Sequence, residues 1–257
     1  MCYDAAQLAF RVYKEAVRLE ASKEEINRLR ERWKKLEKVH TNYYHISGFQ
    51  HPKLLAYHLD KDDSLDIDHF YWGLIPKWAK DEEHAEKIWN STINARSESL
   101  SEKPSFRDAY LKHRCLIPLQ GFYEHHHSHG KSFPYFIREH KKEVMFVAGI
   151  FDEWLNKNTG ELVRSMSVVT TRGNNKMATI HNNPKLDEPR MPLILEDSSA
   201  RKWLNEPEVV LSEFNGENLQ LNSWTVRKLR GKQYAGNTKK AWEKYNYGEL
   251  NDHQKLF

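Results

Sequence analysis

The chain has 257 residues, with 40 Lys and Arg against 36 Asp and Glu and a formal net charge of +4. Aromatic residues make up 12% of it, and the longest apolar stretch, residues 144–151, is too short to cross a bilayer, so we expect neither disorder nor a membrane span. Only two cysteines occur, which excludes a disulfide framework and a four-cysteine zinc module. The N-terminus lacks a signal pattern, so we expect a cytoplasmic protein.

The N-terminal segment is predicted to be helical and highly charged. Between Ala5 and about Val39, apolar residues recur at three- or four-residue steps, which is typical of one helical face. Ser22, followed three residues later by Glu25, predicts a helix start with a capping box. We therefore expect two helices here, or one broken helix.

Beyond residue 40, the apolar residues follow a different pattern. Short apolar or alternating runs predict strands at residues 53–59, 69–75, 114–122, 135–137, 144–151, 165–171 and 192–195. Helices are expected near 81–89, 104–112 and 198–204, the last of them capped by Ser198. Because strands outnumber helices without βαβ alternation, the sequence predicts an α+β fold with a curved, largely antiparallel, open-barrel-like sheet flanked by helices. We expect a single domain over 1–257, with a core to about residue 205 and a basic extension over 206–257.

Cys2 has a chemical property that an internal cysteine lacks. Removal of Met1 would leave an α-amine beside a thiol, and that amine, with a pKa of about 7.7–8.0, is partly neutral near physiological pH. The amine can form an imine with an aldehyde, and the thiol can then close a thiazolidine ring. The simpler interpretation is a small second residue that permits Met1 removal, or a cysteine packed as a small apolar side chain.

Several further segments mix polar residues with apolar ones. They are Y-W-G-L-I-P-K-W at 71–78, I-N-A-R-S-E at 93–98, R-C-L-I-P-L-Q-G-F-Y-E at 114–124 and S-V-V-T-T at 167–171, followed by His181 and R-M-P at 190–192. In this order, and together with Cys2, they resemble the SOS-response-associated peptidase (SRAP) family, whose members crosslink to abasic sites in single-stranded DNA. The resemblance runs from Cys2 to about Trp203.

The resemblance implies an enzyme of the DNA damage response, classed as a peptidase (hydrolase) or a lyase. It implies that mature Cys2 forms a thiazolidine with the ring-opened aldehyde of an abasic deoxyribose and so shields the lesion from strand cleavage. The expected partner is single-stranded DNA with abasic sites, without a cofactor, a metal or a membrane. We expect a monomer of bacterial type, located on the nucleoid when bound to DNA.

The resemblance also places Asn94, Glu124 and His181 around the crosslink. Glu124 follows an apolar strand, where partial burial would raise its pKa and let it move protons. His181 can exchange a proton near neutral pH, and Asn94 can both donate and accept hydrogen bonds. A strand-end salt bridge, a solvated loop histidine and a turn asparagine are the structural alternatives.

For DNA binding, the resemblance implies that Arg96 and Arg190 meet phosphates and that Thr171 lies at the same interface. Trp72 is the candidate for stacking on a base, although a tryptophan near a Gly-Pro turn is most often core surface. A surface ion pair is the ordinary alternative for an arginine. The family usually has Gly and Arg after Cys2, whereas Tyr3 and Asp4 stand here. The candidates to replace the missing arginine are Lys14, Arg18 and the basic residues Arg227, Lys228, Arg230, Lys232, Lys239 and Lys240.

Three competing interpretations remain open. On a strand, His125, His127 and His129 would share one face and form a metal site, although a His-rich surface hairpin is the simpler interpretation. Cys2 could instead act as the N-terminal nucleophile of a peptidase, with His181 or its own amine as the base. The third is a noncatalytic single-strand binder that uses only tryptophans and basic residues.

Overall fold

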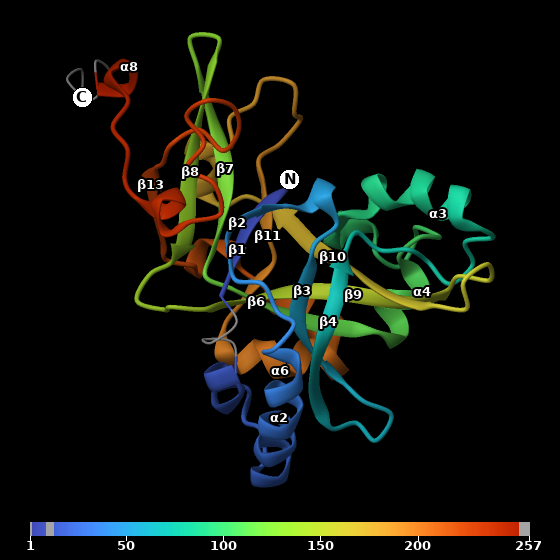
Figure 1. Cartoon of the computed structure of the whole chain (residues 1–257). Coiled ribbons are helices and arrows are strands. Elements are labelled where there is room, and N and C mark those ends of the chain that lie inside the picture. Colours follow the sequence, from blue (N-terminus) through green and yellow to red (C-terminus); the bar gives the residue numbers. More distant parts are fainter. Residues whose placement is uncertain (1, 9–12, 252–257) are drawn as a thin grey trace.

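The structure, a computed structural model, describes residues 2–8 and 13–251, and its strands form two sheets (Figure 1). The first sheet is antiparallel and has the strand order β13-β8-β7-β1-β2. Its strands are Leu221–Thr225 (β13), Lys131–Glu139 (β8), Gly121–Ser128 (β7), Asp4–Gln7 (β1) and Tyr43–Ser47 (β2). Because β1 lies between β7 and β2, the first residues of the chain are held inside a sheet.

The second sheet contains a closed barrel. Its strand order is β11-β10-β4-β3-β6-β9-β12, and β9 also pairs with β10, which closes β10, β4, β3, β6 and β9 into a ring. The short β5 and the longer β4 run parallel to β10, and the other pairs are antiparallel. The strands are Lys53–Leu59 (β3), Leu65–Trp72 (β4), Asn94–Arg96 (β5), Arg114–Leu119 (β6), Met145–Leu155 (β9), Leu162–Arg172 (β10), Arg190–Pro192 (β11) and Ile194–Leu195 (β12).

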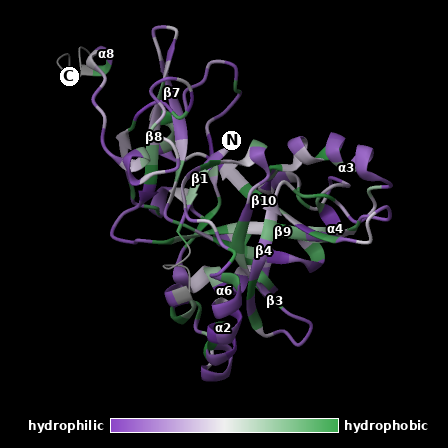
Figure 2. Cartoon of the chain, in the orientation of Figure 1, coloured by the Kyte–Doolittle hydropathy of each residue, from purple (hydrophilic) through white to green (hydrophobic). Residues whose placement is uncertain are grey.

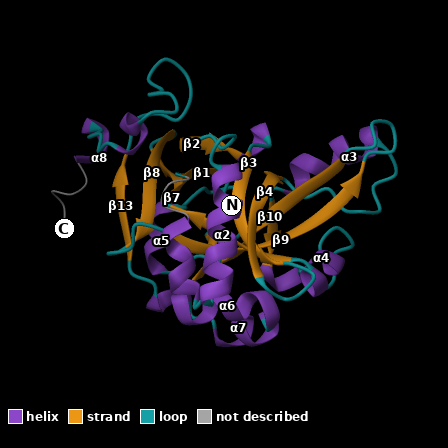
Figure 3. Cartoon of the chain, turned by 60° about the horizontal axis from the view of Figure 1, so that its bottom comes forward, coloured by secondary structure: helices purple, strands orange, loops and turns teal. Residues whose placement is uncertain are grey.

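Helices cover one end of the barrel and flank the sheets. The helices are Lys23–Leu36 (α2), Glu82–Trp89 (α3), Arg107–Lys112 (α4), Asn175–Ile180 (α5), Asp197–Asn205 (α6), Pro207–Glu213 (α7) and Gly248–Asn251 (α8), with a 3₁₀ helix at Tyr13–Leu19 (η1). Figure 3 shows α2, α6 and α7 together beneath the strands. Their buried residues Leu29, Trp203 and Val210 share one core with Tyr57 of β3. Burial of this apolar surface drives the docking of the helices.

The distribution of hydropathy agrees with this arrangement. Figure 2 shows apolar residues along the barrel strands and polar residues along α2 and α3. Within the described ranges, no helix combines the length and the apolar composition that crossing a membrane requires.

The expected α+β class, the single domain and the largely antiparallel pairing are confirmed. The capping box is also confirmed, because Ser22 Oγ accepts from the Glu25 amide at 3.1 Å and Glu25 Oε2 accepts from the Ser22 amide at 2.8 Å. The strand predicted at 53–59 matches β3. The barrel is closed rather than open, because the long β9 and β10 pair over residues 149–155 and 162–168.

Three local predictions are wrong. The helix expected from Ala5 begins instead as strand β1, because pairing with β2 and β7 outweighs the local apolar period; part of that period, residues 9–12, lies outside the described residues. The strand expected at 114–122 is two strands, β6 in the barrel and β7 in the other sheet, separated at Gln120. Ser198 lies inside α6, which starts after Glu196 without a side-chain cap.

Candidate functional site

The N-terminal strand brings Cys2 to the place where the two sheets meet. Asp4 pairs with Tyr123 of β7 and Ser47 of β2, and the Gly48 amide donates to the Tyr3 carbonyl at 2.7 Å. Cys2 is only 1% exposed, and burial raises the pKa of its thiol far above the ordinary range. The negative charge of the nearby Glu124 carboxylate also raises the pKa of this thiol. The chain still carries Met1, so this is the environment of Cys2 before cleavage.

Glu124 and His181 lie close together and are both buried. His181 Nδ1 is 3.6 Å from Glu124 Oε2, and the two residues are 5% and 8% exposed. Loss of solvation raises the pKa of Glu124 to about 7 and lowers that of His181 to about 4. At neutral pH, His181 is therefore uncharged and Glu124 is divided between its acid and carboxylate forms, so the contact is not an ion pair.

Asn94 opens β5 beside Val168 of β10. Its side chain is buried, and neither its Oδ1 nor its Nδ2 has a hydrogen-bond partner in the described part of the chain. Leaving a buried polar group unpaired costs about 1–3 kcal/mol. Cys2 packs in the same apolar cluster as Ile93 and Ile180, the residues that precede Asn94 and His181. The fold thus brings the four predicted residues around the crosslink into one region.

Arg190 has a different environment from the predicted phosphate contact. Its side chain is only 2% exposed, and its guanidinium pairs with Glu98 and Glu188, each at 2.8 Å. Its backbone N and O lie 3.1 and 3.0 Å from His181 Nδ1, so they hold the imidazole in place. The guanidinium is already neutralised by carboxylates, and the arrangement assigns Arg190 to positioning of His181 and Glu98 rather than to DNA.

Trp72 also differs from its expected role. Its side chain is fully buried, and its indole N–H donates to the Ile93 carbonyl at 3.0 Å. A Cβ on Gly48 would come within 2.7 Å of Ile93 and 3.1 Å of the Trp72 ring. Trp72 therefore forms the packed floor beneath the site and has no free face for a base. Trp78 is 41% exposed, but its indole N–H donates to Pro104.

The two remaining DNA-contact candidates lie on neighbouring strands. Arg96 ends β5, pairs with Thr170 of β10 and is exposed, and Thr171 is the next, half-exposed residue of β10. The burial that raises the pKa of Tyr3 is opposed by the charge of Arg96, so this cation lies near the N-terminal strand. Of the candidates to replace the N-terminal arginine, Arg18 is bound to Asp197 of α6, whereas Arg230 reaches Asp4 at 3.1 Å.

One aromatic pair beside Cys2 was missed by sequence reasoning. The rings of Tyr3 and Phe49 lie 4.9 Å apart between centroids, and Phe49 is 50% exposed. The sequence signal was weak, because Phe49 stands in a short Ser-Gly-Phe-Gln turn and only the 3₁₀ helix at Gly48–Gln50 turns it toward Tyr3. This pair offers the exposed aromatic surface that Trp72 does not.

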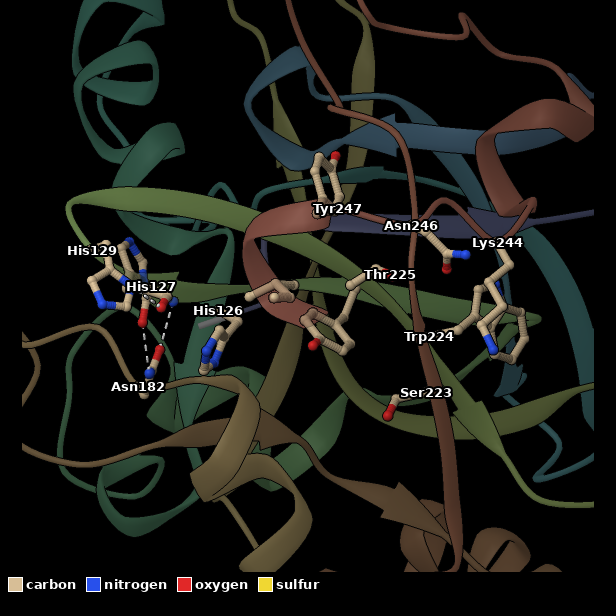
Figure 4. A pocket seen from close by; sticks show the side chains of 13 residues that line it. His126, His127, His129, Asn182, Ser223, Trp224, Thr225, Lys244, Asn246 and Tyr247 are labelled. Carbon is tan, nitrogen blue, oxygen red and sulfur yellow. Dashed lines mark hydrogen bonds between the residues drawn. The ribbon is translucent and has the colours of Figure 1, made fainter. Parts of the chain in front are cut away.

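The histidine run forms the surface hairpin of β7 and β8. His129 and Gly130 have φ angles of 48° and 72°, as a two-residue turn between paired strands requires. Among the described residues, no group of three His, Cys, Asp or Glu side chains is arranged to hold a metal ion. The hairpin is tied to the His181 loop, because Asn182 Oδ1 accepts from the His127 amide at 2.7 Å and Nδ2 donates to its carbonyl at 2.9 Å (Figure 4).

Figure 4 shows a pocket of about 590 Å³ between this hairpin and the C-terminal segment. It is lined by His126, Tyr135, Trp224, Lys244 and Tyr247 among others. None of the residues predicted for catalysis or DNA contact lines it. It is therefore a separate feature from the region around Cys2.

Comparison with known proteins gives relatives along most of the chain. This chain is 41% identical over 135 residues to abasic site processing protein YoqW of Bacillus subtilis. The aligned region covers 52% of this chain and 55% of that protein. This chain is also 32% identical over 213 residues to abasic site processing protein HMCES of Mus musculus, which covers 70% of this chain and 58% of that protein. The chain thus spans about half the length of the curated relatives it matches.

Solved structures give the same relationship at the level of the fold. A crystal structure of a protein from Bacteroides thetaiotaomicron superposes with a TM-score of 0.78 and 27% identity, covering 95% of this chain and all of that one. One from Bordetella bronchiseptica, 20% identical, shares the fold with a TM-score of 0.65. The model of the SOS response associated peptidase (SRAP) family matches residues 13–229, and the chain belongs to that family.

Proposed function

We propose that this protein captures abasic sites in single-stranded DNA as a covalent thiazolidine on Cys2, after removal of Met1. The relatives that carry the name abasic site processing protein support the lesion as the target. The residues around Cys2 support the chemistry. The proposal places Cys2 as the nucleophile, Glu124 as the proton carrier and Asn94 as the residue that holds the product.

The observation that carries the proposal is the unpaired amide of Asn94. An amide buried without a partner is unfavourable unless a ligand satisfies it, and it offers both a donor and an acceptor. An opened deoxyribose presents hydroxyl and carbonyl oxygens, and a thiazolidine presents a ring nitrogen. Either would complete the hydrogen bonding of the buried Asn94 amide.

The reaction proceeds in three steps. The neutral amine of mature Cys2 attacks the aldehyde carbon C1′, a C–N bond forms, and a proton moves to the oxygen. Glu124 in its acid form protonates the resulting hydroxyl group, which leaves as water and gives the iminium ion. The thiol then adds to that carbon, and its proton returns to Glu124. The net change is one C–N bond, one C–S bond and one released water.

The groups near the site match the ionisation states that these steps need. A pKa of about 7 leaves Glu124 able both to give and to take a proton at neutral pH. Neutral His181 supplies a base for the C1′ hydroxyl as the sugar ring opens. Burial raises the pKa of the Cys2 thiol in the uncleaved chain, which favours a reaction that uses a thiol over one that needs a thiolate. Addition to an iminium ion tolerates a thiol.

We assign the DNA contacts to the exposed side chains around Cys2. Arg96 and Thr171 lie at one edge and meet the phosphate backbone. The exposed face of Phe49, backed by Tyr3, stacks on a base next to the lesion. Stacking of this kind tolerates any sequence, as a lesion sensor requires.

The test is intact mass spectrometry of the purified protein mixed with a single-stranded oligonucleotide that carries one abasic site. We expect an adduct with the mass of the protein without Met1 plus the oligonucleotide minus one water, stable without reductant. The same strand in a duplex should react more slowly. An oligonucleotide with a tetrahydrofuran analogue, which has no aldehyde, should give no adduct.

Two cysteine variants give a matched comparison. Cys2→Ala should abolish the adduct that is stable without reductant, whereas Cys115→Ala, at the buried cysteine of β6, should retain it. Cys2→Ala and Cys2→Ser both keep the α-amine of residue 2, so each should give only an imine that survives after reduction, without a stable thiazolidine. Recovery of protein that retains Met1 and does not react, or an adduct formed equally by Cys2→Ala, would contradict the proposal.

A further inference from the structure

The basic C-terminal segment, residues 226–245, packs against the N-terminal strand. The Tyr234 hydroxyl lies 2.8 Å from His45 Nδ1, and His45 Nε2 lies 3.0 Å from Asp4 Oδ1. Arg230 Nη2 donates to the same Asp4 oxygen at 3.1 Å. Asp4 is two residues from Cys2, about 7 Å along an extended strand. The segment is thereby held next to the residue proposed to react with DNA.

Contacts with β2 fix the rest of the segment. Asn237 Oδ1 accepts from the Tyr44 amide at 2.7 Å, and its Nδ2 donates to the Asn42 carbonyl at 2.9 Å. The Trp242 indole N–H donates to the Tyr44 carbonyl at 2.6 Å. In Figure 1 the segment lies beside β1, β2 and β8 in the red part of the chain. It is therefore a structured surface rather than a loose tail.

A pocket of about 490 Å³ opens on this segment. It is lined by the cationic side chains of Arg227, Lys232 and Lys240, by the rings of Tyr234 and Tyr245, and by Gln233, Ala235 and the acidic Glu243. Arg227 lies over the Tyr245 ring at 4.7 Å from its centroid, and Tyr234 is 37% exposed. None of the three cations pairs with a carboxylate within the described part of the chain. Unpaired cations beside aromatic faces are the combination that binds single-stranded nucleic acid.

Arg230 connects this pocket to the region of Cys2. Its side chain is 62% exposed, while its partner Asp4 is 5% exposed, so the carboxylate fixes the guanidinium and leaves much of it in solvent. A guanidinium held in this way presents its remaining N–H donors for a phosphate. Most of the segment lies beyond the family match, which ends at residue 229.

We propose that the basic C-terminal segment binds the DNA strand on one side of the lesion, with Arg230 on the nearest phosphate and the Tyr234–Lys240 pocket on the nucleotides beyond it. This inference rests on the proposed function, since it assumes that the DNA enters at Cys2. The segment would be a second surface that contacts the DNA. Only one of the two parts of the strand that flank the lesion, either the 5′ part or the 3′ part, would reach it. Asp4 acts as the positioning residue for Arg230.

The test uses the noncovalent binding of tetrahydrofuran-containing single strands, measured by fluorescence anisotropy at several salt concentrations. One oligonucleotide has a flank only 5′ of the lesion analogue, and the other has a flank only 3′ of it. Lys232→Gln/Lys240→Gln should lower the slope of log affinity against log salt by about 1.4, because each phosphate contact on a single strand contributes about 0.7. Only one of the two oligonucleotides should show this loss.

A charge-matched control is Lys23→Gln/Lys61→Gln, at exposed lysines of α2 and of the β3–β4 turn. In Figure 1, α2 and this turn lie at the opposite end of the molecule from the segment. This control should leave the slope unchanged. Arg230→Gln should lower the slope for the same oligonucleotide that the Lys variant affects. Tyr234→Phe should bind better than Tyr234→Leu, because the ring rather than the hydroxyl stacks. The covalent yield at saturating DNA should stay the same in the Lys variants.

Three outcomes would overturn the inference. They are a slope that does not change in the Lys232 and Lys240 variant, an equal change in the control, and an equal loss for the 5′ and 3′ flanks. Because the tetrahydrofuran strands cannot react, this test does not depend on covalent capture. A protein that binds these strands through the segment but forms no adduct would contradict the proposed function alone.

Discussion

Replacing Glu124 by Gln should stabilise the protein, and by an amount that depends on pH. The carboxyl is 8% exposed, and its pKa is about 7 against an ordinary value of 4.5. A difference of about 2.5 pKa units corresponds to about 3 kcal/mol of unfavourable free energy for the charged form. Gln has nearly the same shape and never carries the charge.

The direction of the pH dependence follows from the pH range in which the folded and the unfolded chain each release the proton of Glu124. Below pH 4.5 the carboxyl is protonated in both the folded and the unfolded chain, so it imposes no penalty. Between pH 4.5 and 7 the unfolded chain alone loses the proton, and the folded state loses stability progressively until the penalty is complete above pH 7. At pH 5 the penalty is about 1 kcal/mol and at pH 8 about 3 kcal/mol. The free energy of unfolding gained by Glu124→Gln should therefore be about 2 kcal/mol larger at pH 8 than at pH 5.

The measurement is urea-induced unfolding of the wild-type protein and of Glu124→Gln at the two pH values. His181 has a pKa of about 4 in the folded chain against an ordinary value of 6.5, so it affects the stability of both proteins between pH 5 and pH 8. This effect cancels when Glu124→Gln is compared with the wild-type protein at the same pH. Glu161→Gln, at an exposed carboxylate, is the matched control and should show no such difference. An equal effect of Glu124→Gln at pH 5 and pH 8 would refute the reasoning, because Glu124 would then have an ordinary pKa despite its burial. The same variant should slow covalent capture, since the proton carrier is lost.

Three further substitutions test other parts of the site. Asn94→Leu should raise the free energy of unfolding by about 1 kcal/mol while slowing capture, because it removes an unpaired buried amide that we assign to the ligand; chemical denaturation and adduct yield measure the two effects, and a loss of stability would contradict the assignment. Phe49→Ala should weaken binding of a tetrahydrofuran strand by about 1–3 kcal/mol in anisotropy titrations, and unchanged affinity would remove Phe49 as a stacking residue. Arg190→Met should lower the free energy of unfolding by about 2 kcal/mol, less than for a fully buried pair because Glu98 and Glu188 are 41% and 34% exposed. If Arg190→Met instead left stability intact and reduced the salt dependence of DNA binding, Arg190 would be a phosphate ligand after all.

The structure also explains why Trp72 does not have the exposed ring that was expected of it, while Asn94 remains a candidate for the site. Trp72 and Asn94 both stand in family segments. Trp72 packs in the apolar cluster with Ile93, whereas the buried amide of Asn94 has no hydrogen-bond partner among the described residues. Residue type alone does not distinguish these environments, because the direction of each side chain depends on how β4 and β5 pair with β10. Arg190 is a similar case, since Glu98 comes from a segment 92 residues away.

The amino-acid sequence by itself determined the local features of this protein. The capping box at Ser22, the strand at residues 53–59 and the histidine hairpin depend on neighbours a few residues apart, and their side-chain patterns can be interpreted without a fold. The ordered motifs from Cys2 to Arg190 also identified the family, because each keeps its residue types together along the chain.

Only the tertiary structure decided the properties that depend on distant segments. Pairing with β2 and β7 makes Asp4–Gln7 a strand, the β9–β10 contact closes the barrel, and burial sets the pKa values of Glu124 and His181. The physical reason is the same in each case. Solvation, pairing and packing energies are set by contacts across the fold, which no local period in the sequence contains.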